Sequence, residues 1–297
     1  MIICKNIVNV FIAWLFFSSM TVCLSQKPIE KNQTGKTRIV SLAPSLTESI
    51  YLLEMGTSLV GNTIYCNTPK DAQKIKRVAS AVDVNVEEVV RLNPDLIVAT
   101  HLTDHRAMKK FELLGFKTAY FSQPHTFNKM ADQFLSLGQQ LGQTQLAEKR
   151  VRLARNRIKL LTAPLDNVSL QKVFVQLGAR PLYAATGESF VNDLITLAKG
   201  MNIAANEKNA IYSKEKVIAS NPDVILITSM GMTGEEEKQR WLQFNSLKAA
   251  QSKRVHIIDS ELFCSPTVES FSKALQQLIQ LLHPKLDRDN MHESKSN

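Results

Sequence analysis

The sequence has few cysteines and lacks the signature motifs of common enzyme classes. Only four cysteines occur in 297 residues, and two of them, Cys4 and Cys23, lie in the N-terminal segment. There is no Gly-x-Ser-x-Gly elbow, His-Glu-x-x-His helix or phosphate-binding P-loop, and no Gly-x-Gly-x-x-Gly turn follows the first predicted strand. These absences argue against the corresponding hydrolase, metalloprotease and nucleotide-binding classes, and we expect no enzymatic activity.

Long apolar runs are also missing, except at the N-terminus. No later segment is apolar over the ~18–20 residues that a membrane-spanning helix requires. At the N-terminus, Lys5 precedes an apolar stretch at residues 7–17, and small and polar residues follow. This pattern predicts a signal peptide at residues 1–25, a polar tether at 26–37 and, at the other end, a polar tail at 285–297.

The cysteines leave several interpretations open. Cys23 could carry a lipid anchor, although the preceding Met20-Thr21-Val22 lacks the small residue expected just before a lipidated cysteine. After export the chain keeps Cys66 and Cys264, one in each half of the sequence. They could be free, paired in a disulfide or ligands of a metal.

A dense basic cluster is absent, although the formal net charge is +9. The 36 Lys and Arg residues are interleaved with 27 Asp and Glu residues, without neighbouring stacking aromatics. Nucleic-acid binding usually needs a concentrated basic patch or groove. We therefore expect no nucleic-acid partner, and we expect a monomer.

The sequence does contain an internal repeat. Residues 86–100 are VEEVVRLNPDLIVAT and residues 214–228 are KEKVIASNPDVILIT, identical at seven of fifteen positions. Each copy predicts a short amphipathic helix, a stop at Asn-Pro-Asp and a buried parallel strand. The repeat therefore predicts two similar α/β lobes, and the cleft between them is the expected ligand site.

The surrounding pattern alternates strands with helices, which is typical of parallel-rich sheets covered by helices. In the first half we predict strands at 38–42, 59–65, 96–100 and 117–121 and helices at 45–55, 86–92, 106–114 and 127–141. Ser45 and Glu48 have the spacing of a capping box. In the second half, besides the repeat, we predict strands at 172–177 and 254–258 and helices at 190–198, 241–250 and 268–282.

One long helix is predicted at residues 144–161, because no helix breaker occurs there before Pro164. It separates the two halves of the sequence. The predicted fold class is α/β, with two Rossmann-like lobes linked by this helix. The predicted boundaries are 38–142 for the N-terminal lobe, 143–164 for the connecting helix and 165–284 for the C-terminal lobe.

With these motifs the chain resembles the substrate-binding proteins of ABC importers, in the class with two lobes joined by a single helix. That class serves the uptake of vitamin B12, haem and iron–siderophores. The resemblance covers roughly residues 38–282, through RIVSLAPSLTE at 38–48, the two repeats and NSLKAAQSKRVHIID at 245–259. It implies a periplasmic, non-enzymatic protein that captures a metal chelate and delivers it to an importer, with no obligatory cofactor.

Within this family a carboxylate at the tip of each lobe binds arginines of the membrane permease. The matching positions here are Glu87 and Glu215, each in the first turn of its repeat helix. Bidentate Arg–carboxylate pairs give orientation as well as energy. An acid at this position also complements the helix dipole, which is a purely structural role.

The expected ligand is a cobalamin-type corrinoid, followed by haem or a ferric siderophore. Residues 61–80 resemble the cleft segment of the cobalamin-binding members, where Tyr65 falls on a ligand-contacting tyrosine. Two features depart from that pattern: Ala81 replaces a tryptophan that packs on the corrinoid, and a second aromatic position falls at or near Thr100 and His101.

Ligand contacts in such lobes are expected in loops at the carboxyl ends of strands. The candidate ligand-binding residues are Ser45, Tyr65, Cys66, Thr100, His101, His105, Gln123, Gly187, Met230, Phe263 and Cys264. His101 and His105 could also share a metal with a cysteine, which makes a bare transition-metal ion the alternative ligand. Two loop histidines without a ligand, or a periplasmic enzyme assembled from separate loops, are further interpretations.

Overall fold

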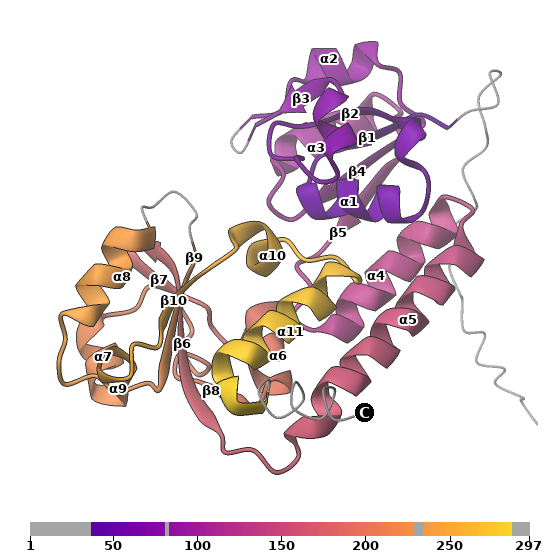
Figure 1. Cartoon of the computed structure of the whole chain (residues 1–297). Coiled ribbons are helices and arrows are strands. Elements are labelled where there is room, and N and C mark those ends of the chain that lie inside the picture. Colours follow the sequence, from indigo (N-terminus) through magenta and orange to yellow (C-terminus); the bar gives the residue numbers. More distant parts are fainter. Residues whose placement is uncertain (1–36, 81–82, 229–233, 287–297) are drawn as a thin grey trace, which may run out of the picture.

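The computed structural model describes residues 37–80, 83–228 and 234–286, which form two α/β lobes (Figure 1). The predicted signal peptide, Cys23, Met230 and the tail from residue 287 onward lie outside the described residues. Among the described residues, no helix combines the length and the apolarity that a bilayer crossing needs. The predicted α/β fold class, with two lobes and one long linking helix, is confirmed.

The first lobe is built on a parallel five-stranded sheet in the order β3-β2-β1-β4-β5. Its strands are β1 (Ile39–Ser41), β2 (Leu59–Thr63), β3 (Arg77–Ala79), β4 (Leu96–Thr100) and β5 (Thr118–Phe121), and its α-helices are α1 (Pro44–Leu52), α2 (Val86–Arg91), α3 (His105–Leu113) and α4 (Phe127–Gln140). Two short 3-10 helices, Gly56–Ser58 and Lys70–Lys74, flank β2.

The second lobe has β9 in its sheet between β10 and β6, while β7 and β8 pair along the other edge of β6. Its strands are β6 (Gln171–Ala179), β7 (Leu182–Ala184), β8 (Gly200–Asn202), β9 (Val224–Thr228) and β10 (Val255–Ile258). Its helices are α6 (Phe190–Leu197), α7 (Lys214–Ser220), α8 (Gly234–Leu242), α9 (Lys248–Gln251), α10 (Ser260–Cys264) and α11 (Ser270–Leu282). Only β7 runs antiparallel to its neighbour.

Two local predictions are wrong. The single helix predicted at 241–250 is two helices, because the chain turns at Asn245-Ser246, two residues that favour turns, and α9 restarts at Lys248. The capping box at Ser45 is also absent. Helix α1 begins one residue earlier at Pro44, a favoured first helical residue, and no side chain caps it.

The Asn-Pro-Asp turns of the two repeats have the same role in both lobes. Asp95 Oδ2 accepts a 2.8 Å hydrogen bond from the backbone N–H of Arg38, at the start of the central strand β1. In the second lobe, Asp223 Oδ2 accepts a 2.8 Å bond from the N–H of Lys172 in β6. Each repeat therefore ties its own strand to the central strand of its sheet.

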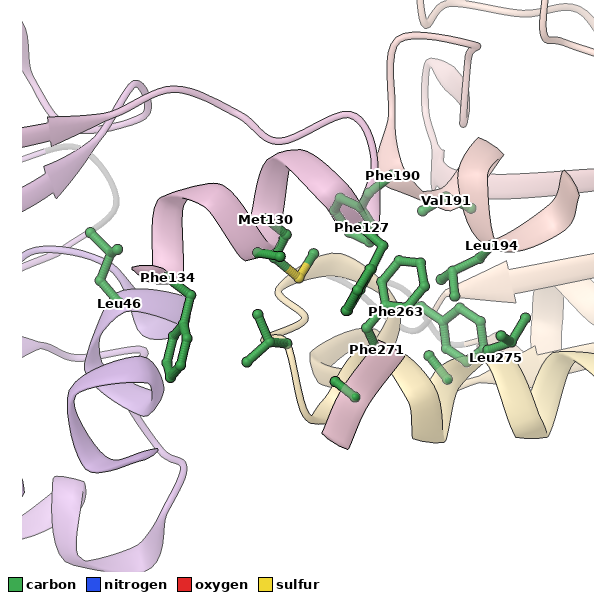
Figure 2. Packing of buried hydrophobic residues seen from close by; sticks show 14 of the residues in the cluster. Leu46, Phe127, Met130, Phe134, Phe190, Val191, Leu194, Phe263, Phe271 and Leu275 are labelled. Atoms are coloured by element: carbon green, nitrogen blue, oxygen red, sulfur yellow. The ribbon is translucent and has the colours of Figure 1, made fainter. Parts of the chain in front are cut away.

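The strands alternate between two apolar layers, as buried parallel strands do. In β4 and β9, for example, Leu96 and Leu226 face one common core, whereas Ile97 and Ile225 face separate outer cores in their own lobes. The common core continues from the first lobe through α4 and α5 (Thr144–Thr162) into the second lobe. Figure 2 shows this packing from Leu46 and Phe134 to Phe271 and Leu275.

The junction between the lobes is therefore more than one helix. α5 packs against α4 and against α11. α4 approaches α5 closely at Gly138, where an added Cβ would lie 2.5 Å from the Ala147 Cβ. At its other end, α4 is held by the second lobe, because Asp193 accepts a 2.7 Å hydrogen bond from the backbone N–H of Phe127. Burial raises the pKa of Asp193.

Candidate ligand-binding site

A cavity of about 950 Å³ lies between the two lobes. Its first-lobe wall comes from the loops that follow all five strands of the sheet, with residues such as Ser45, Tyr65 and Thr100. The second lobe contributes mainly the segment from Ser260 to Val268, which follows β10. The cavity thus lies at the carboxyl ends of parallel strands, where ligands of open α/β sheets bind.

The loop after β2 presents Tyr65 to the cavity, with half of its surface (50%) exposed. Arg77 in β3 holds this loop: its guanidinium Nη1 donates to Asn62 Oδ1 at 2.8 Å and to the carbonyls of Thr63 and Cys66. A cationic side chain therefore fixes the backbone on both sides of Tyr65 and leaves the aromatic ring free to contact a ligand.

Beneath this wall, Cys66 is fully buried. Its Sγ lies 3.1 Å from Thr47 Oγ1 and 3.2 Å from Thr63 Oγ1, and Thr47 Oγ1 also lies 2.8 Å from Ser41 Oγ. These four side chains form a hydrogen-bonded cluster below the cavity. Cys66 therefore lies behind the cavity wall and packs against the residues that form it.

Two hydrogen bonds cross the cavity between the lobes, each joining a threonine to a carboxylate. Thr267 Oγ1 of the second lobe donates to Glu48 Oε1 at 3.2 Å. In the opposite sense, Thr68 Oγ1 of the first lobe donates to Glu261 Oε2 at 3.2 Å. All four residues line the cavity.

The titration of the cavity groups follows from their burial. Desolvation raises the pKa of Glu48, against the lowering effects of the Thr267 hydrogen bond and the charge of Lys273. Desolvation and the neighbouring Asp259 raise the pKa of the Cys264 thiol to about 11. At neutral pH Cys264 is therefore a protonated thiol, which is a poor nucleophile.

Comparison with known proteins identifies the family. Residues 39–262 match the model of the periplasmic binding protein family. The chain belongs to this family. It is 25% identical over 266 residues to the vitamin B12-binding protein of Vibrio parahaemolyticus, covering 88% of this chain and 92% of that protein. It is 27% identical over 217 residues to the vitamin B12-binding protein of Photorhabdus laumondii, covering 72% and 76% of the two chains.

Solved structures of periplasmic binding proteins have the same architecture. The crystal structure of the periplasmic vitamin B12-binding protein of Vibrio cholerae matches with a TM-score of 0.73 at 26% identity, covering 82% of this chain and 96% of that chain. The periplasmic haem-binding protein of Roseiflexus matches with a TM-score of 0.75 at 22% identity, covering 84% and 99%. The second likeness shows a common fold alone.

The structure of this periplasmic binding protein separates the candidate ligand-binding residues into two groups. Five line the cavity: Ser45, Tyr65, Thr100, Gln123 and Cys264. Met230 lies outside the described residues, as does Ala81 at the position of the missing tryptophan. The wall also contains residues that the sequence did not single out as ligand-facing: Glu48, Phe134, Glu261 and Thr267.

The other candidates lie outside the cavity wall. Phe263 is buried in the common core, one residue before Cys264 on the short helix α10. Gly187 donates a 3.1 Å hydrogen bond to the Ala205 carbonyl, and a Cβ there would lie 2.4 Å from that oxygen, so this glycine serves a close backbone contact.

The structure does not bring together the histidines and cysteines of the predicted metal site. His101 is exposed, and the ring of His105 packs edge-on against Tyr120, with 6.4 Å between ring centroids. Throughout residues 37–80, 83–228 and 234–286, no three His, Cys, Asp or Glu side chains gather as metal ligands would. Cys66 and Cys264 are both free, without a disulfide between them.

The two predicted docking carboxylates lie on helices far apart in the molecule, α2 and α7 (Figure 1). Both side chains are exposed, and within the described part of the chain neither Glu87 nor Glu215 forms an ion pair. Hydrogen bonds from its own backbone N–H and from Ser213 lower the pKa of Glu215. The neighbouring Glu88, by contrast, pairs with Lys76 and Arg91.

Proposed function

We propose that this protein is an exported solute-binding protein that captures a metal chelate between its lobes and delivers it to an ABC importer. The preferred ligand is a cobalamin-type corrinoid, and haem or a ferric siderophore follows. The observation that supports this proposal is the cavity of about 950 Å³ at the strand ends of both lobes, in a chain related to vitamin B12-binding proteins. Its volume is near the upper end of the ~300–1,000 Å³ found for small-molecule sites.

The lining suits a broad, partly apolar chelate. Phe121, Phe134 and Phe190 supply apolar surface, and Tyr65 supplies a half-exposed aromatic ring. Hydroxyl and amide side chains such as Ser45 and Gln123 supply hydrogen-bonding groups around it. A site of this kind binds the organic periphery of a chelate, so the metal arrives already complexed. Among the described residues no three potential metal ligands gather in this lining, which disfavours a bare ion.

Delivery would use Glu87 and Glu215. These two carboxylates are exposed and free of ion pairs in the described chain, so binding to permease arginines would break no existing pair. Such pairs would align the two lobes on two membrane subunits. The protein would act from the periplasm, exported by residues 1–25 and either free or anchored through Cys23.

Visible absorption tests this function. The mature protein is mixed separately with cobalamin, hemin and a ferric siderophore, desalted and scanned. We expect the corrinoid spectrum to remain at about one per protein. Tyr65→Ala should weaken corrinoid binding by at least about tenfold, whereas Tyr120→Ala, which changes a tyrosine of equal exposure (49%) outside the cavity, should leave it unchanged. Colourless protein after all three mixtures would contradict the proposal.

A further inference from the structure

The cavity wall has an unusual charge balance for a chain of formal net charge +9. Among the described residues that line it there is no Lys, Arg or His, but there are four carboxylates: Glu48, Asp83, Asp104 and Glu261. The two undescribed internal segments, residues 81–82 and 229–233, also contain no basic residue in their sequences. The ligand therefore meets hydroxyls, amides, apolar groups and negative charge.

Of the four carboxylates, Glu48 and Glu261 are better placed to contact a ligand than the two aspartates. Asp104 caps helix α3 by accepting a hydrogen bond from the Arg106 N–H and also lies 3.6 Å from the Arg106 guanidinium. Asp83 is exposed beside the short turn that it forms with Ser80. Glu48 is half-buried and Glu261 is exposed, and they project from opposite lobes. Each accepts a hydrogen bond from a threonine hydroxyl across the cavity.

The charges that act on Glu48 are two carboxylates and one cation, and the cation lies outside the cavity wall. Glu261 and Glu269 add negative potential at Glu48, and Lys273 is the cation that opposes them. Lys273 lies 4.0 Å from Glu269, which also pairs with Arg150, and neither cation lines the cavity. A carboxylate on a bound ligand would therefore face like charge without a basic residue in the cavity wall.

We propose that Glu48 and Glu261 make this site selective for uncharged or cationic chelates whose edges carry amides, and that they exclude chelates bearing carboxylates. This proposal rests on the proposed function and refines its ligand class. An amide N–H can replace the threonine hydroxyl as donor to each carboxylate, and such charge-assisted bonds are strong. A carboxylate in the same place is repelled and cannot donate a hydrogen bond to either acceptor. Corrinoid amides fit this description, whereas the propionates of haem do not.

The test compares cobalamin with a cobalamin monocarboxylate in which one peripheral amide has been hydrolysed. The two ligands share shape, metal and colour, so they differ in one charged group. At pH 8 we expect the full-length mature protein to bind the monocarboxylate at least about tenfold more weakly than cobalamin. In Glu48→Gln the difference in affinity between the two ligands (the affinity gap) should shrink to about threefold or less. The glutamine oxygen can still accept a hydrogen bond from Thr267, but the negative charge is gone. Several monocarboxylate isomers are tested, each with a different peripheral amide hydrolysed. The isomer with the largest loss of affinity relative to cobalamin identifies the amide that faces Glu48.

Matched variants control this test. Glu112→Gln makes the same change on helix α3 outside the cavity and should leave the tenfold gap intact. Glu261→Gln tests the opposite wall, and it stands in for Glu48→Gln if thermal melting shows that variant to be unfolded. Equal affinity of the wild-type protein for cobalamin and every monocarboxylate would overturn charge selection and leave the proposed function intact. Loss of the gap in Glu112→Gln would overturn the assignment to Glu48 and Glu261. Failure to bind either corrinoid would overturn both proposals.

Discussion

The two copies of the helix–turn–strand repeat do the same structural work but face the cavity differently. Both place an asparagine with positive φ after the helix, 41° at Asn93 and 45° at Asn221. The strands that follow end in Thr100 and Thr228. Thr100 lines the cavity, whereas Thr228 is fully buried and its hydroxyl donates to carbonyls of β6. The repeat therefore preserves the scaffold, while the same residue type, threonine at the strand end, faces the cavity in one lobe and the interior in the other.

The unequal walls follow from the chain path after the central strand of each lobe. In the first lobe, β1 leads through a cavity-lining loop into α1. In the second, β6 turns directly back as antiparallel β7, with Tyr183 packed over Gly178. The second lobe therefore presents little of its central strand to the cavity and relies on the segment after β10. The two-lobe likeness predicts where a cleft lies but not which lobe forms most of it.

The largest effect should come from removing the carboxylates that we expect to bind the permease, one in each lobe. We expect Glu87→Ala combined with Glu215→Ala to abolish uptake in cells that carry the partner importer, because truncating one side of a buried charge pair costs about 2–5 kcal/mol per site. Ligand affinity should stay within about twofold, since neither residue lines the cavity. If both lobes contribute equally to docking, Glu87→Ala alone and Glu215→Ala alone should each cause a similar, partial loss of uptake.

The control for this prediction is Glu88→Ala. It removes a neighbouring carboxylate that is already paired with Lys76 and Arg91, whose hydrogen bonds and charges lower its pKa. Uptake should be nearly unchanged in this variant. A large loss of ligand affinity in the double variant, or an equal transport loss in Glu88→Ala, would remove the docking role.

A smaller effect should come from the aspartates of the two turns. We expect Asp95→Ala and Asp223→Ala each to lower the free energy of unfolding by about 1.5–3 kcal/mol, because each removes a charged acceptor from a backbone N–H. Asp132→Ala, an exposed acid on α4, should change it by no more than about 0.5 kcal/mol.

Urea unfolding of the same variants also asks whether the lobes unfold together. Trp241 is the sole tryptophan after the predicted signal peptide, so its fluorescence reports the second lobe, while circular dichroism reports both. Because the apolar core is shared, the two signals should coincide in Asp95→Ala. Separate midpoints would show that the junction does not couple the lobes.

The fold was predictable because its information is local. Apolar runs, Asn-Pro-Asp stops and glycine-terminated helices specify buried strands and short connections without reference to distant residues. The site depends on pairings that no local pattern records. Glu48 fits a capping box by spacing, yet its partner Thr267 is 219 residues away in the other lobe.

Residues adjacent in the sequence can also point in different directions, which no local pattern predicts. Tyr65 and Cys66 both follow β2, but the turn held by Arg77 directs the ring to the cavity and the thiol inward. Phe263 and Cys264 were predicted as neighbours in a loop. They lie instead on helix α10, where successive side chains point about 100° apart, so one enters the core and the other the cavity. Helix α10 has only five residues, too few for its periodicity to show in the sequence.

The smallest effect on stability should come from replacing the two asparagines that follow the repeat helices. Asn93→Ala should cost about 1 kcal/mol, because alanine tolerates the left-handed region poorly, and Asn93→Gly should restore stability. Asn221 has a second role, since its Oδ1 accepts a 2.9 Å hydrogen bond from the backbone N–H of Lys248 at the start of α9. Asn221→Gly should therefore still cost about 0.5–1.5 kcal/mol in urea unfolding. If both glycine variants were equally stable, the Lys248 bond would contribute nothing, and the two turns would be equivalent after all.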